Sequence, residues 1–85
     1  MSNPIPIGGY GQRWHVRIAR KLRNSWGHCD YDKREIVLSK ESQEKGIDRE
    51  VLIHEVLHKV MPFLTEECID LAAVEVNESL EACGY

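Results

Sequence analysis

Two histidines four residues apart, with a glutamate directly after the first, are the residues whose types and spacing could do chemistry. His54, Glu55 and His58 form the pattern His-Glu-x-x-His. Residues four apart lie on one face of an α-helix, so both imidazoles could bind the same zinc ion at about 2.0–2.1 Å. Glu55 lies roughly 100° further round the helix, which suits a base that takes a proton from zinc-bound water. The pattern predicts one zinc ion per chain and hydrolysis of a peptide-type bond, with the bound water as nucleophile and Glu55 as general base.

Histidines at helical spacing also occur as ordinary core or surface residues. The two interpretations differ in whether the histidines lie on the apolar face of the same helix. The apolar residues that define this face are Leu52, Ile53, Val56, Leu57 and Val60. At about 100° per residue, His54 and His58 lie more than 90° from the centre of that stripe. The two histidines are therefore expected to lie off the core face, where a metal can reach them.

A catalytic zinc site needs a third protein ligand, because it keeps three protein ligands and one open position. No histidine follows His58, which favours a carboxylate. If a second helix returns antiparallel after the turn at Pro62, its ligand should lie about as far after the turn as His58 lies before it. This rule indicates Glu66 or Glu67. Glu75 and Glu78 lie too far along the second helix unless the turn is longer, and the less favoured candidates of other residue types are His28, Cys29 and Cys68.

The phase of the second helix favours Glu66 over Glu67. The residues expected to pack against the first helix are Ile69, Ala73, Val76 and Leu80. Stepping back three residues from Ile69, or seven from Ala73, reaches Glu66, which places it beside the packed face. Glu67 falls roughly 160–180° from that face and is expected to point to solvent, where it stabilises the helix dipole. The predicted zinc ligands are therefore His54, His58 and Glu66.

The elements before the motif are expected to be strands. Apolar and polar residues alternate over 13–18, as in a half-buried strand. Residues 26–31 and 34–39 indicate two further strands, joined by a turn over 30–33. The polar segment 40–46 is expected to be a loop. Together these segments predict a small antiparallel sheet of about three strands.

The motif itself is expected on a helix with recognisable ends. Asp48 is a plausible N-cap, and Ile47 and Leu52 could form the hydrophobic staple across it. The helix is expected to end near Met61, because Pro62 disfavours helical geometry in the residue before it. The chemistry-bearing residues would thus be presented by one short, well-delimited helix.

A second helix is expected to begin after Thr65, a good N-cap, and to end near Gly84. The short connection should make the two helices antiparallel neighbours. Strands followed by helices indicate the α+β class. We therefore expect an irregular N-terminal arm over 1–12 and one α+β domain over 13–85.

Composition sets limits on the class of protein. The chain has 85 residues, of which 42% are hydrophobic and 29% charged, with a net charge of −3. These values are typical of a soluble globular domain and give no nucleic-acid footprint, although Arg13–Arg23 is locally basic. The three cysteines show no C-x-x-C spacing, which favours a reducing compartment. With no signal peptide or membrane-length apolar segment, we expect a cytoplasmic protein.

The sequence resembles the small zincin-type metallopeptidases found in bacteriophage and bacterial genomes. The likeness covers about residues 14–85, and the specific part is His54-Glu55-x-x-His58 followed by Pro62. Looser matching segments are Trp26-Gly27-His28-Cys29-Asp30, Arg34-Glu35-Ile36-Val37-Leu38, Leu64-Thr65-Glu66-Glu67 and the closing Gly84-Tyr85. The resemblance implies a minimal zincin-like domain over 13–85 in a bacterial or phage-infected host cell. It also implies a zinc peptidase with Glu66 as third ligand, and it implies no particular substrate.

Two other interpretations stay open at the level of sequence. The domain could be a zinc-stabilised binding or accessory module with little or no turnover, since a small chain gains stability from a structural metal. It could also be a host-interaction protein that keeps the motif as a relic. Water in the fourth zinc position would favour an enzyme, and a protein ligand there would favour a structural site. For an enzyme, we expect an edge strand to hold an extended peptide, with oxyanion help from His28, Tyr31 or an arginine.

Overall fold

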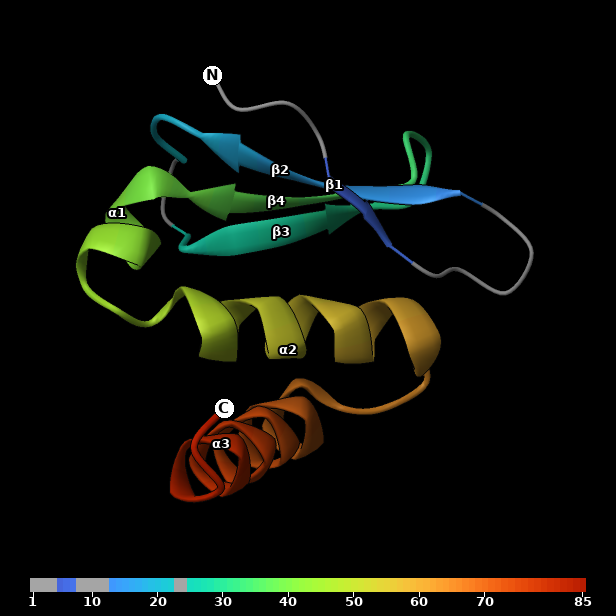
Figure 1. Ribbon diagram of the computed structural model, residues 1–85. Helices are drawn as coiled ribbons and strands as arrows, with labels where there is room; N and C mark the ends of the chain where they lie inside the picture. Colours follow the sequence, from blue (N-terminus) through green and yellow to red (C-terminus); the bar gives the residue numbers. More distant parts are fainter. Residues whose placement is uncertain (1–4, 8–12, 23–24) are drawn as a thin grey trace.

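A four-stranded mixed sheet, a short helix and two longer helices make up the fold in the computed structural model, which describes residues 5–7, 13–22 and 25–85. One long helix, α2 (Asp48–Val60), lies between the sheet and the last helix, α3 (Glu66–Ala82) (Figure 1). The expected α+β class is confirmed, and the domain is layered as sheet, middle helix and outer helix. No helix in the described ranges is both long enough and apolar enough to cross a bilayer.

The sheet differs from the one expected in strand number and direction. Its strands are β1 (Ile5–Ile7), β2 (Trp14–Ala19), β3 (Gly27–Asp30) and β4 (Glu35–Ser39), in the spatial order β1-β2-β4-β3. β4 pairs with β2 in parallel, and the other two pairings are antiparallel. The prediction of about three antiparallel strands was therefore wrong. The apolar run Ile36-Val37-Leu38 is buried throughout, as befits a strand with a neighbour on both sides.

Part of the segment expected to be an irregular arm forms a strand. Ile5 aligns with Val16 and Ile7 with Trp14 across the β1–β2 pairing. Pro6 is tolerated here because β1 is an edge strand, where a missing N–H need not break a ladder hydrogen bond. The rest of the predicted arm, residues 1–4 and 8–12, lies outside the described residues.

The segment expected to be a loop after β4 contains helix α1 (Lys40–Glu44). Ser39 is its N-cap, since the Ser42 N–H donates to the Ser39 hydroxyl oxygen over 3.1 Å. The Ser42 hydroxyl in turn donates to the Ser39 carbonyl over 2.7 Å, and both serines are buried. The polar composition that indicated a loop thus reflects a reciprocal serine cap, which satisfies buried polar groups.

The two longer helices begin and end close to their expected limits. α2 spans Asp48–Val60, but its N-cap is Ile47 and no side chain caps it, so the prediction of Asp48 as N-cap was wrong. α3 spans Glu66–Ala82, and Thr65 caps it as predicted, accepting from the Cys68 N–H over 3.2 Å. These boundaries place the motif inside α2 and Glu66 at the first residue of α3.

The main core lies between the sheet and α2. Its buried residues are Trp14, Val16, Ile36 and Leu38, and α2 contributes Val51, Leu52 and Val56. The apolar face expected on α2 was centred on a different side of the helix from these three residues. Val60, the last residue of the expected face, is exposed. Ile69 and Ala73 of α3 are buried as expected, whereas Val76 of the same predicted face is exposed. The face of α2 on the sheet is therefore narrower than the apolar pattern indicated.

Candidate metal centre

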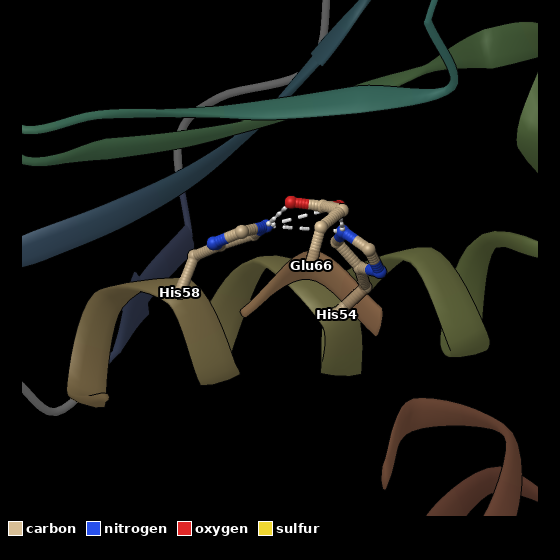
Figure 2. A group of neighbouring side chains, drawn as sticks. All are labelled: His54, His58 and Glu66. Carbon is tan, nitrogen blue, oxygen red and sulfur yellow. Dashed lines mark hydrogen bonds and ion pairs between the residues drawn. The ribbon is translucent and has the colours of Figure 1, made fainter. Parts of the chain in front are cut away.

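Three side chains from the two long helices converge on one point. His54 Nε2 lies 3.1 Å from His58 Nε2, and the Glu66 carboxylate lies 2.8 Å from the first ring and 3.1 Å from the second. Figure 2 shows the three side chains pointing toward one another between α2 and the strands above it. The structure thus brings together the three residues predicted as zinc ligands.

The donor set and its spacing fit a metal ion. One potential ligand atom from each of His54, His58 and Glu66 lies within 4.8 Å of the others. Ligand atoms at 2.0–2.1 Å from one tetrahedral zinc lie about 3.4 Å apart. The observed separations are slightly shorter, so small side-chain rotations would open the space for the ion. Two imidazole nitrogens and a carboxylate oxygen are ligands that zinc binds readily.

Local sequence explains why the three residues meet. The four-residue spacing places His54 and His58 on one face of α2, one turn apart. α2 stops before Pro62, and the Leu64 N–H donates to the Met61 carbonyl over 3.1 Å in the tight turn that follows. Thr65 then starts α3, so that Glu66 begins the return directly beside His58. A longer turn would carry the carboxylate away from the histidines.

Asp70 is a site residue that the sequence reasoning missed. Its Oδ1 atom lies 3.1 Å from His54 Nδ1, the ring nitrogen that faces away from the cluster. A proton shared there leaves the lone pair of Nε2 directed at Glu66 and the metal position, which fixes the tautomer that a ligand needs. The signal was present in the sequence, because Asp70 follows Glu66 by four residues and so shares its face of α3.

Glu55 is the buried residue of α2, with only 6% of its surface exposed. Burial is the main cause that raises the pKa of its carboxyl above the usual range; the Glu66 charge also raises it, while His54 and His58 lower it. Its place beside the sheet was not anticipated, because the sequence indicated an apolar core face on α2. A buried carboxyl with a raised pKa beside a ligand cluster is typical of catalytic acids and bases.

A cavity of about 560 Å³ connects Glu55 with the ligand cluster. Its floor is formed by α2 and α3, and β3 with the residues before it forms one wall. The lining includes His54, Glu55, His58 and Glu66 as well as Trp26, Gly27, Val51 and Ala73. A Cβ on Gly27 would lie 2.8 Å from both the Val37 carbonyl oxygen and Val51 Cγ1. Glycine is thus required for β3 to pack this closely on α2.

The ligand group that the described residues form is His54, His58 and Glu66, and the other candidate ligands do not belong to it. Glu67 and Cys68 are exposed. His28 lines the cavity. Because side chains alternate between the two faces of a sheet along a strand, the His28 side chain points to the opposite face from that of Cys29. Tyr31 donates its hydroxyl to a backbone carbonyl. No arginine is among the described residues that line the cavity, and the oxyanion donor therefore stays unassigned.

No protein-family model, curated protein or solved structure matches the chain.

Proposed function

We propose that this chain is a zinc-dependent hydrolase that cleaves a peptide-type bond. The observation that carries the proposal is the convergence of His54, His58 and Glu66 on one point of a cavity that Glu55 also lines. In the described part of the chain, three protein donors converge there and no fourth joins them. Three ligands with one open position is the arrangement of catalytic zinc sites, whereas structural sites are closed by four.

Zinc bound there would lower the pKa of a coordinated water toward about 7 and polarise a substrate carbonyl. The protein supplies the proton transfer. Glu55 is the group suited to accept a proton during attack and return it to the leaving amine, because it lines the same cavity and burial raises its pKa. Asp70 holds the His54 ring in the orientation that a ligand needs.

An edge strand beside the cavity supports an extended substrate. β3 is the last strand of the sheet order, so one of its sides has no partner strand among the described residues. The Ser39 N–H donates to the Trp26 carbonyl over 2.8 Å. This bond fixes which residues of β3 direct their backbone groups toward β4, because such residues alternate along an antiparallel strand. By that alternation, the backbone N–H and C=O groups of Gly27 and Cys29 point to the open side. A peptide could pair with them as an added strand.

The alternative is a zinc-stabilised binding module with little turnover. The observation that favours it is that the ligands join two helices, with His54 and His58 on α2 and Glu66 on α3. An ion held there would bind α3 to the rest of a small domain. The two functions differ in their dependence on Glu55, because a structural site needs no general base.

The test is hydrolysis of a mixed peptide library by the zinc-loaded protein and by Glu55→Gln, which keeps the size of the side chain but removes the base. The proposal expects cleavage by the native protein and a loss of about two or more orders of magnitude in the variant, at unchanged zinc content. Equal cleavage rates in both proteins would contradict the role of Glu55. No cleavage by fully zinc-loaded native protein across the library would favour the binding module.

A further inference from the structure

The backbone carbonyl of the metal-ligand residue His58 has no partner within its own helix. In an α-helix this carbonyl accepts from the N–H four residues later, and that residue is Pro62, which has none. The preceding carbonyl, that of Leu57, still accepts from the Met61 N–H over 2.8 Å. The helical ladder therefore ends at the residue just before the ligand.

Tyr31 supplies the missing donor from outside the helix. Its hydroxyl donates to the His58 carbonyl over 2.5 Å, and it comes from the turn between β3 and β4. The ring is itself held by the core, since it packs edge-on against Trp14 with ring centroids 5.8 Å apart and an interplanar angle of 88°. Trp14 is only 6% exposed. A chain of contacts thus runs from Trp14 of the sheet through Tyr31 to the backbone of His58.

We propose that Tyr31 is a positioning residue of the metal centre, acting on His58 through this carbonyl. The inference rests on the proposed zinc site and adds a residue to it. The final turn of a helix frays easily, because its carbonyls lack intrahelical donors. Ligand distances in a metal site are held within about 0.2 Å, so a small movement of the His58 backbone changes metal affinity. Tyr31 reduces that movement by fixing the one carbonyl that Pro62 leaves open.

The experiment compares zinc dissociation constants, measured by competition with a chromophoric chelator, in native protein and Tyr31→Phe. Phenylalanine keeps the ring on Trp14 and removes only the hydroxyl, and circular dichroism checks the fold before each titration. Loss of a group that orients a ligand weakens metal binding by about 10- to 100-fold, and we expect a change in this range. Tyr85→Phe, which removes the hydroxyl of another exposed tyrosine, should bind zinc like native protein.

Two further variants separate positioning from general stability. Ser39→Ala removes the side-chain cap of α1, a helix that contributes no residue to the ligand group, and should leave zinc affinity unchanged. Pro62→Ala restores an N–H four residues after His58, so Tyr31→Phe combined with Pro62→Ala should bind zinc more tightly than Tyr31→Phe alone. If Tyr31→Phe does not fold, recovery of zinc binding in the double variant decides the question, and its absence contradicts the inference.

The outcomes distinguish this inference from the proposed function. If native protein binds zinc and Tyr31→Phe binds it equally well, the positioning role is wrong and the metal site stands. Equal weakening by Tyr31→Phe and Ser39→Ala would also overturn the role, because stability alone would explain both. If native protein binds no zinc, the proposed function fails, and the inference fails with it.

Discussion

The Nδ1 atom of His54 lies 3.1 Å from the Oδ1 atom of Asp70, on the opposite side of the ring from the metal position. Nε2 of the same ring lies 2.8 Å from Glu66, so two carboxylates one turn apart on α3 contact one imidazole of α2. The outer helix therefore carries both the carboxylate of the proposed ligand group and the carboxylate that orients His54. This arrangement makes the metal centre depend on the packing of α3 against α2.

Replacing Asp70 with alanine should weaken zinc binding without unfolding the protein. The His54 ring would lose the acceptor that fixes its tautomer, and losses of this kind cost about 10- to 100-fold in metal affinity. The measurement is the zinc dissociation constant at neutral pH. Glu78→Ala, which removes an exposed carboxylate elsewhere on α3, is the matched control. An unchanged dissociation constant in Asp70→Ala would show that this contact does not support the ligand.

The third ligand can be tested with two neighbouring glutamates. Glu66→Ala should weaken zinc binding strongly, because it removes the carboxylate that contacts both histidines. Glu67→Ala should leave zinc binding nearly unchanged, since Glu67 is exposed and lies outside the ligand group. Isothermal titration of the metal-free proteins with zinc provides the comparison. A strong loss in Glu67→Ala together with a weak one in Glu66→Ala would reverse the assignment.

The ligand set was predictable because its geometry is local. The four-residue spacing, the helix stop before Pro62 and the cap at Thr65 together fix where Glu66 falls relative to His58, and each depends on a few neighbouring residues. Asp70 was not predicted, because it contacts a ligand residue and does not belong to the ligand group. Its four-residue spacing from Glu66 nevertheless places both carboxylates on the same face of α3. The burial of Glu55 depends on the close approach of β3, which sequence periodicity does not reveal.

The sheet was predicted less well, because strand pairing is not local. The hairpin of β3 and β4 followed from its turn, where the Asp30 carboxylate accepts the N–H groups of Asp32 and Lys33 over 3.0 and 3.1 Å. The parallel pairing of β4 with β2 joins segments that are separated in sequence by a whole strand. In the sequence, only the unbroken apolar run of β4 indicated that this strand lies in the centre of the sheet. Pro6 concealed β1, since proline argues against a strand except at an edge.

Removing the metal should lower thermal stability. Zinc bound by residues of α2 and α3 stabilises the native state alone, so a strong chelator should lower the melting temperature of zinc-loaded protein. Differential scanning calorimetry before and after chelation measures the change. The same chelator should have no effect on His54→Ala, which lacks a ligand. A native melting curve that does not change after confirmed zinc removal would mean that the ion contributes little to holding the helices together.

The reactivity of the Cys29 thiol should depend on pH in a way that reports the Glu55 charge. Burial is the main cause that raises the pKa of Cys29, and the Glu55 charge raises it further. Since the thiolate is the reactive form, alkylation of Cys29 by iodoacetamide should rise with pH at a higher midpoint than that of a cysteine in a short unstructured peptide. Glu55→Gln should lower the Cys29 midpoint but leave it above that of the peptide. Peptide mapping by mass spectrometry measures the midpoint, and a Cys29 midpoint at or below the peptide value would contradict this view of the surroundings of Cys29.

The most direct test of the central claim is the zinc content of the purified protein, measured by inductively coupled plasma mass spectrometry after exhaustive dialysis. The convergence of His54, His58 and Glu66 predicts about one zinc ion per chain in native protein. His54→Ala and His58→Ala, each checked for a native circular dichroism spectrum, should retain almost none. Full zinc content in both folded variants, or none in native protein supplied with zinc, would contradict the metal centre and the function proposed from it.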